Sequence, residues 1–526
     1  MSASPPNDQT PGVYVNEINA FPRSIVEVPS AIPAFIGYTP KAEYKGKSYL
    51  NKPVKITSFN DFKAFFMLPD PPAPADPAAQ YSPQFYTSKL DKAPEQGDSY
   101  KINGELYAIE PDPGTIYYLY NMIRQYFQNG GGEAYVVSVG TYGKPTGSPI
   151  KPGDRIVNFN VRLNELMHGL SLIKQIPEIT LYVVPEATLL NTDDNSQLMQ
   201  AMLTQGAEMN AFSILDIIGG RAPDPVLYMQ DIAEFRNSTG NHNLSFGAAY
   251  YPFVITTTTS ADELSYLNLN DGNLNTLKSL ISPENAPNKA AEELFSQIRH
   301  SVPKVTAAQI NNILLNVSQP YRLIMGVIRD KVNTLPPSAT MVGIYHQIDN
   351  SEGFWLAPAN VTPIGVTKVT LSIDNKMQEG LNVDAVSGKS INAIRFFNGQ
   401  GLLVWGARTL DGNSQDWRYI NVRRTMIVIE QSIKVALEAF SFSKNDSNTW
   451  TSVKAMIENF LNNLWQQGAL QGSSPDQAFS VSVGIGSTMT AQDILEGRMI
   501  VAVKLALIRP AEFIILQLEQ EMSETE

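Results

Sequence analysis

The stretch IYYLYNMIRQYFQNGGGEAYVVSV, residues 116–139, indicates the fold class of this chain. Its first half repeats apolar side chains at helical spacing, at Ile116, Leu119, Tyr120, Ile123 and Phe127. The Asn-Gly-Gly-Gly run at residues 129–132 predicts the end of that helix, and residues 134–139 then predict a buried strand. A helix, a glycine turn and a strand in direct succession are typical of a protein that mixes helices with a sheet.

The same alternation continues toward the C-terminus. Residues 181–184, 212–218 and 246–252 are short apolar runs that predict further buried strands, and residues 197–209 show a helical pattern between them. Residues 260–334 are polar and rich in Asn, Ser and Leu, and we expect mostly helices there. We therefore predict an α/β or α+β protein with several domains, because 526 residues exceed what one hydrophobic core accommodates.

The C-terminal third has the clearest periodicity. Apolar residues three or four positions apart predict two helices, with faces formed by Val422, Met426, Ile429, Ile433, Leu437 and Phe440, and by Val453, Met456, Ile457, Phe460, Leu461 and Leu464. Alternating apolar residues predict strands over residues 479–483 and 499–507. A last strand is expected at residues 513–518, before an acidic tail.

Each end of the chain carries a short segment with β character, residues 13–18 and residues 513–518. A strand cannot satisfy its backbone hydrogen-bonding groups alone. Two alternatives stay open from the pattern: each segment pairs inside its own domain, or it joins the sheet of a neighbouring molecule.

Composition excludes several classes of protein. The chain has no cysteine, which removes disulfides and thiolate chemistry, and its net charge of −12 argues against a dedicated nucleic-acid binder. The first residues lack a secretory signal, and no apolar run reaches 18 residues. We expect a protein made and kept soluble in the cytoplasm, unless it leaves by lysis or within a particle.

No motif for catalysis, a cofactor or a metal stands out. The four histidines are far apart in sequence, and Asp193, Asp194 and Asp224, which could hold a divalent ion, are interpreted as solvated loop carboxylates. Residues 386–390, Val-Ser-Gly-Lys-Ser, are similar to the end of a P-loop, but Val383 stands where the first glycine is required. We interpret that segment as a turn between two strands. The remaining alternative is an enzyme with an unfamiliar site, for instance a hydrolase that uses Asp216 or Asp349.

Several blocks together resemble the contractile phage tail sheath family. They are residues 10–17 (TPGVYVNE), 34–37 (AFIG), 126–137, 212–216, 249–252, 335–360, 405–409 (WGART), 417–424 (WRYINVRR), 468–472 and 509–513 (RPAEF). The blocks keep the same order along the whole chain, densely over residues 1–40 and 335–526, whereas residues 41–115 and 260–330 match little. One chain carries both the N-terminal and the C-terminal blocks, which is more similar to phage, tailocin and extracellular injection sheaths. Type VI secretion sheaths divide the equivalent between two proteins.

The resemblance implies a mechanical protein rather than an enzyme. Sheath subunits stack as six-fold rings around an inner tube on a baseplate, and contraction drives the tube through a target envelope. The implied partners are other copies of the chain, the tube, the baseplate and cap proteins, with no cofactor, nucleic acid or membrane insertion. Another particle protein, such as a tube or capsid subunit, is the alternative.

The resemblance also implies an organisation and a set of contact residues. We expect an N-terminal arm at residues 1–40, a Pro-rich outer insertion at 41–115, an outer α/β domain at 116–334 and an inner domain at 335–526. Strand exchange between subunits is expected at Val13, Tyr14, Val15, Ile18, Phe513, Ile514, Ile515, Leu516 and Leu518. The helix over residues 421–440 is a candidate tube contact through Arg423, Arg424 and Lys434.

Overall fold

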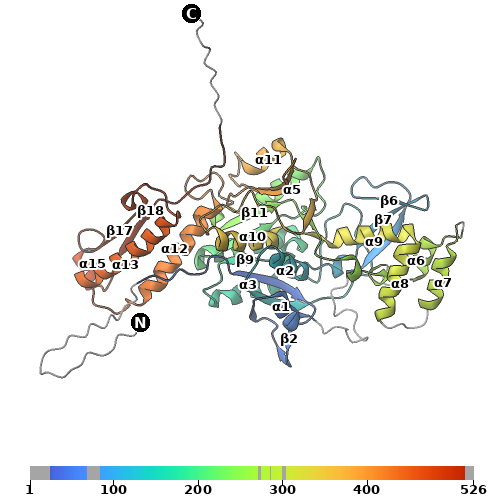
Figure 1. Ribbon diagram of the computed structural model, residues 1–526, viewed down its shortest axis with the longest axis horizontal. Coiled ribbons are helices and arrows are strands. Elements are labelled where there is room, and N and C mark those ends of the chain that lie inside the picture. The colour runs from blue at the N-terminus through green and yellow to red at the C-terminus, as the bar shows by residue number, and fades with distance from the viewer. Residues whose placement is uncertain (1–23, 68–82, 270–273, 285, 299–303, 516–526) are drawn as a thin grey trace, which may run out of the picture. The chain divides into compact units, whose positions relative to one another are not determined.

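The computed structural model describes residues 24–67, 83–269, 274–284, 286–298 and 304–515 (Figure 1). The chain divides into two compact units. Unit 1 comprises residues 1–28 and 428–507, and unit 2 comprises residues 29–427 and 508–526. The mixture of helices and sheets confirms the predicted fold class.

Unit 2 is built on an eight-stranded sheet with the order β16-β15-β11-β10-β9-β1-β8-β4. The strands are β1 (Pro33–Thr39), β4 (Pro53–Ile56), β8 (Ala134–Thr141), β9 (Leu181–Val183), β10 (Phe212–Asp216), β11 (Gly247–Tyr251), β15 (Asn392–Phe397) and β16 (Gly401–Trp405). All neighbouring strands are parallel except at the two edges, where β4 and β16 run antiparallel to β8 and β15. A parallel sheet is covered on both faces, which is why its strands appear in the sequence as continuous apolar runs.

Helices cover both faces of this sheet. They include α1 (Phe59–Phe66), α2 (Leu119–Gln128), α3 (Leu163–Leu172), α4 (Thr192–Met209), α5 (Tyr228–Ser238), α10 (Ser338–Ser351) and α11 (Asn375–Asn382). Neighbouring residues of β1 point to opposite faces, Ile36 toward Gly169 of α3 and Gly37 toward Leu119 of α2. Helix α4 lies beside α3, and α10 lies beside α2.

The helix and turn predicted from residues 116–132 are confirmed. Helix α2 ends at Gln128, Asn129 caps it, and Gly130 has a φ of 86°. The Gly131 N–H bonds the Tyr126 carbonyl at 3.0 Å. A left-handed residue after a helix is least costly for glycine, so the glycine run stops the helix and lets β8 begin.

A second hydrophobic core in unit 2 joins two segments that are far apart in sequence. One supplies the three-stranded sheet β5-β7-β6, with β5 (Phe85–Leu90), β6 (Tyr100–Ile102) and β7 (Glu105–Pro111). The other supplies α6 (Leu274–Ile281), α7 (Lys289–Ile298), α8 (Lys304–Val317) and α9 (Gln319–Val332). Phe85 and Ile109 from the first segment are buried together with Tyr321 and Ile324 from the second. We call this part the lateral module.

Three short strands lie next to the lateral module, in the order β13-β12-β14. They are β12 (Val254–Thr256), β13 (Thr334–Leu335) and β14 (Val366–Val369). The P-loop-like residues 386–390 lie between α11 and β15. Our interpretation of a turn between two strands was therefore wrong on one side, because α11 occupies the residues before the turn.

Unit 1 contains α13 (Ser447–Gln466), α14 (Pro475–Ala478), β17 (Phe479–Val483), α15 (Ala491–Leu495) and β18 (Val501–Leu505). Helix α12 (Ile420–Glu438) runs through the division, which falls between Ile427 and Val428. The predicted apolar face of α13 is buried, and the helix packs on β17.

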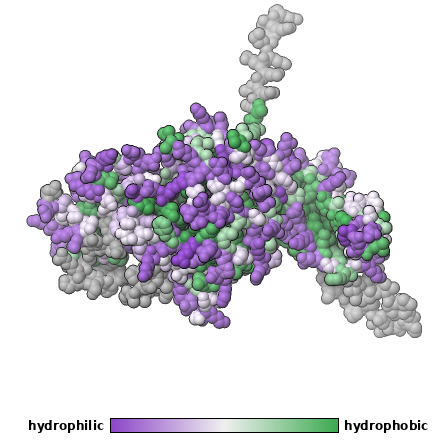
Figure 2. All heavy atoms as spheres, turned by 180° about the vertical axis from the view of Figure 1, so that it is seen from behind, coloured by the Kyte–Doolittle hydropathy of each residue, from purple (hydrophilic) through white to green (hydrophobic). Residues whose placement is uncertain are grey.

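The sheet of unit 1 is small. Strands β17 and β18 are antiparallel, with Val481 opposite Val503, and form a two-stranded sheet within the described part of the chain. In the view of Figure 2, a band of hydrophobic residues is exposed over unit 1, on the right of the picture. A two-stranded sheet is marginal in water, so this hairpin gains stability from any further strand.

Candidate functional site

The described residues contain no group of three or more His, Cys, Asp or Glu side chains that could hold a metal ion. Nor does any helix in the described ranges have the length and apolarity to cross a membrane. Two kinds of feature stand out among the described residues: buried charged side chains, and the exposed apolar segment at residues 513–515.

Asp216, a candidate hydrolase residue, lies at the end of β10 and caps a helix. The Ser338 N–H and Oγ–H donate to its two carboxylate oxygens at 3.0 and 2.5 Å, at the start of α10. Burial raises the pKa of Asp216 to about 7, although the bonds from Ser338 oppose this. Both oxygens thus hold α10 to the sheet.

Glu186 plays the same part for α2. Its Oε1 accepts the N–H groups of Tyr118 and Leu119 at 3.1 and 2.9 Å. A Cβ on Gly37 would lie 2.2 Å from the other oxygen, so the glycine in β1 gives this carboxylate its space. Burial raises the pKa of Glu186 to about 8 despite the backbone bonds. Sequence reasoning missed Glu186, since nothing local marks a glutamate as buried.

These two carboxyl groups predict how stability depends on pH. Both bind a proton in the folded chain up to about pH 7–8 but release it near pH 4 when unfolded. The unfolded state thus binds fewer protons between these values, and the free energy of unfolding falls as pH rises, on the order of a few kcal/mol. Urea denaturation at pH 5.5 and pH 8.5 measures this slope. E186Q and D216N should flatten it, and an unchanged slope in both variants would contradict the assignment.

Asp349, the other candidate hydrolase residue, is ion-paired with Arg424. The side chains of both are 3% exposed. Arg424 Nη1 donates to Asp349 Oδ1 at 2.9 Å, and its Nη2 contacts Oδ2 and the Ser30 carbonyl. The Ser30 hydroxyl donates to Asp349 Oδ2 at 2.6 Å, and the guanidinium lies 4.7 Å from the ring centre of Tyr345. Asp349 on α10 is thus joined to α12 through Arg424 and to the segment before β1 through Ser30.

Arg423 is also in the interior. Its guanidinium lies 3.6 Å from the Trp417 ring centre and 4.3 Å from that of Phe246, and Nη2 donates to Ser245 Oγ at 3.0 Å. Lys434, by contrast, is exposed. Of the three candidate tube contacts, only Lys434 presents its side chain to solvent, so the expected contact rests on that residue.

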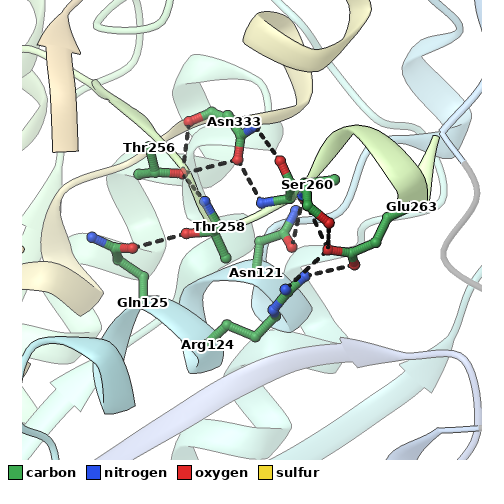
Figure 3. Close-up of polar contacts among 9 residues, drawn as sticks. Asn121, Arg124, Gln125, Thr256, Thr258, Ser260, Glu263 and Asn333 are labelled. Atoms are coloured by element: carbon green, nitrogen blue, oxygen red, sulfur yellow. Dashed lines mark hydrogen bonds and ion pairs between the residues drawn. The ribbon is translucent and has the colours of Figure 1, made fainter. Parts of the chain in front are cut away.

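A polar cluster connects the lateral module to the sheet (Figure 3). The helical segment of the module, α6 to α9, is entered through residues 256–263 and left at Asn333; we call these two connections the crossings. Asn333 joins the two crossings, because its Oδ1 accepts the Thr259 N–H at 2.7 Å and its Nδ2 donates to the Thr259 carbonyl at 2.8 Å. Its own carbonyl accepts the Thr256 N–H at 2.8 Å.

Helix α2 also binds residues 256–263, the first of the two crossings. Gln125 Oε1 accepts the Thr258 hydroxyl at 2.8 Å, and Arg124 makes a bidentate pair with Glu263 at 2.8 and 3.0 Å. Sequence reasoning missed this cluster, because Asn333 and Thr259 are 74 residues apart and neither belongs to a motif.

The predicted exchange segments lie at the limits of the description. Val13, Tyr14, Val15, Ile18, Leu516 and Leu518 fall outside the described residues. Phe513, Ile514 and Ile515 are described, have no strand assignment, and are 70%, 87% and 83% exposed. Apolar side chains this exposed at the end of a folded region are typical of a segment that binds a partner.

Comparison of the sequence and the fold with known proteins shows which family this chain resembles. Residues 413–521 match the family model of the phage tail sheath C-terminal domain. The contracted helical sheath of the anti-feeding prophage is similar along its length, with 26% identity, a TM-score of 0.57, and coverage of 98% of this chain and 100% of that chain. Residues 413–521 thus carry a phage tail sheath domain, and the whole chain is similar to contractile sheath subunits. The contracted sheath complex of the PVC extracellular contractile injection system gives similar agreement, at 25% identity, TM-score 0.56, and coverage of 99% of this chain and 100% of that chain.

Sequence similarity to curated sheath proteins is more restricted. The tail sheath protein of Vibrio phage KVP40 is 28% identical over 164 residues, which cover 30% of this chain and 24% of that protein. The match thus spans about a quarter of the length of the curated relatives. The resemblance inferred from the sequence is confirmed, and the matched region contains α13, β17, β18 and Glu512.

Proposed function

We propose that this chain is the structural subunit of a contractile sheath. It polymerises as stacked six-fold rings around an inner tube in an extended, metastable state, and contraction drives the tube through a target envelope. The observation that carries the proposal is the similarity, over 99% of the chain, to a sheath complex in its contracted state. The remaining partners are baseplate and cap proteins, with assembly in the cytoplasm before the particle is released or anchored.

The work of contraction comes from a difference in packing between two states. A bistable assembly releases free energy when its subunits repack, and it needs no nucleotide. Asp216 and Asp349, which an enzyme could have used, are engaged in holding α10 and α12. These contacts favour a mechanical role over a hydrolytic one.

Strand exchange links the subunits in this proposal. Residues 13–18 and 513–518 of one copy join the sheet of a neighbour, where the β17–β18 hairpin offers a strand edge. The exposed side chains at Phe513, Ile514 and Ile515 support this, because pairing with a neighbour would cover them. Residues 335–526 with the N-terminal arm face the tube, Lys434 is the contact candidate, and residues 41–115 and 116–334 lie outside.

Electron microscopy tests the proposal directly. Purified protein in negative stain is expected to form rings or tubules, and sedimentation should show large polymers. Discrete small particles at every concentration would contradict a sheath and favour an enzyme. Closed shells would favour a capsid subunit.

A further inference from the structure

Glu512 is bound by three separate parts of unit 2. Its Oε1 accepts hydrogen bonds from Asn382 Nδ2 and Arg408 Nε, both at 2.9 Å. Its Oε2 accepts from Arg408 Nη2 at 2.7 Å and from the Tyr419 hydroxyl at 3.0 Å. The fork of an arginine on both oxygens of a carboxylate fixes direction as well as distance.

Arg408 is held in place by contacts that do not involve Glu512. Its side chain is 5% exposed, and its backbone N–H and carbonyl each bond the Asn392 side chain at 2.8 Å. Arg408 also forms an antiparallel bridge with Tyr419, which places both side chains on the same carboxylate. The backbone of Arg408 is therefore fixed without Glu512, and Arg408 Nη1 also donates to the Asn382 carbonyl at 3.3 Å, which reduces the entropy lost on binding the carboxylate.

The arrangement explains three of the blocks that carry the sequence resemblance. Residues 405–409 supply Arg408, residues 417–424 supply Tyr419, and residues 509–513 supply Glu512. Burial opposes ionisation of Glu512, but the bonds from Arg408, Asn382 and Tyr419 outweigh it and lower its pKa. The carboxylate is thus charged at neutral pH.

Glu512 separates a bound stretch of chain from an exposed one. The Ile508 carbonyl is bonded by Asn421 Nδ2 at 3.0 Å, and Glu512 follows four residues later. Immediately after Glu512, the side chains of Phe513, Ile514 and Ile515 are at least 70% exposed. If Glu512 were released, residues 509–512 could move about Ile508 within a reach of at most about 13 Å, and the exposed segment would move with them.

We propose that Arg408, Asn382 and Tyr419 form a clamp on Glu512 that sets the point and direction in which the C-terminal segment leaves the subunit. These are positioning residues: they make residues 513–518 available at a fixed place and carry tension along that segment into unit 2. The inference rests on the proposed strand exchange between subunits. A short, fixed connection between the clamp and the segment raises the effective concentration of the segment at the neighbouring subunit, and a longer, mobile connection lowers it.

Spin labels on the free subunit test the clamp without any sheath. Because the chain has no cysteine, I514C and K376C introduce the only two thiols, one beyond the clamp and one on the exposed start of α11. The distance distribution between the labels should be narrow in the parent and clearly broader in R408Q, within the reach of about 13 Å that the released residues allow. R509Q is the matched control, since its pair with Asp416 at 3.7 Å is exposed, and it should stay narrow. An equally narrow distribution in R408Q would overturn the clamp.

E512Q provides a second variant if R408Q fails to fold. It keeps the side-chain shape, removes the charge, and should also broaden the distribution. Its melting temperature should fall because Arg408, whose side chain is 5% exposed, loses its counter-ion, and circular dichroism shows that the variant is folded at the temperature of the measurement. No broadening in a folded E512Q would refute the proposal.

Measuring sheath formation in two variants tests the clamp and the proposed strand exchange separately. Deleting residues 513–526 should abolish sheaths, and R408Q should lower the polymerised fraction about tenfold, as expected when a bidentate charged pair is lost. Sheaths that survive the deletion would refute strand exchange through this end, whereas the spin-label result would still judge the clamp. Loss of sheaths on deletion with normal sheaths in R408Q would refute the clamp alone.

Discussion

Replacing Arg424 with methionine is expected to lower the free energy of unfolding by about 3–5 kcal/mol. The reason is the carboxylate left behind. Asp349 is 3% exposed, and without Arg424 it retains only the Ser30 hydroxyl as a charge-stabilising partner among the contacts described above. A buried carboxylate without its counter-ion must either stay charged at great cost or take up a proton. Urea denaturation of unpolymerised protein, followed by circular dichroism, measures the loss.

Two further variants assign the effect to the unpaired charge. R424M/D349N removes both charges and should regain a large part of the lost stability, since an asparagine can still accept the Ser30 hydroxyl. R498M is the exposed control: Arg498 pairs with Asp493 at 2.9 Å but is 57% exposed, so the urea midpoint should hardly move. A double variant no more stable than R424M would show that packing of the arginine, and not the charge on Asp349, sets the loss.

Deleting residues 1–18 is expected to abolish sheath formation while the subunit remains folded. The first strand of the unit 2 sheet begins at Pro33, so the deletion leaves that sheet complete. It also keeps the hydrogen bond within unit 1 from the Val28 N–H to Ser432 Oγ at 3.0 Å. What it removes is the β-capable segment at residues 13–18, whose proposed place is the sheet of a neighbouring copy. Every subunit in a ring loses the same link, so the effect on the polymer should be close to complete. Negative-stain microscopy and sedimentation report it.

A shorter deletion is the matched control. Removing residues 2–9 shortens the arm but keeps residues 10–18, and it should leave sheaths intact. Normal sheaths after deletion of residues 1–18 would exclude exchange through this end. Loss of sheaths in both deletions would point to the length of the arm instead of its strand.

Local patterns predicted the elements of this protein well. Residues 134–139, 212–216 and 247–251 were recognisable as strands, because a strand covered on both faces is apolar at most positions. The stop of α2 followed from its glycines, since only glycine adopts the left-handed conformation without strain. The apolar face of α13 followed from its spacing alone. Each of these features depends on residues within a turn or two of one another.

The charged residues were much less predictable. On a helical pattern Arg423 and Arg424 look solvated, yet one stacks between Trp417 and Phe246 and the other pairs with Asp349. Burial of an arginine depends on which aromatic ring or carboxylate reaches it from another element. Periodicity carries no information about such partners.

The sequence by itself determined the fold class, the positions of the helices and strands with clear periodicity, and, through the order of its motifs, the resemblance to the sheath family. Only the tertiary structure decided that residues 83–111 and 264–332 share one core, that Asn333 joins the two crossings into it, and that Arg408 meets Glu512 across 104 residues. The physical reason is the range of the interactions. Backbone hydrogen bonding and the burial of one face are settled between near neighbours, whereas a buried ion pair or a shared core exists only after distant segments have been brought together by the whole fold.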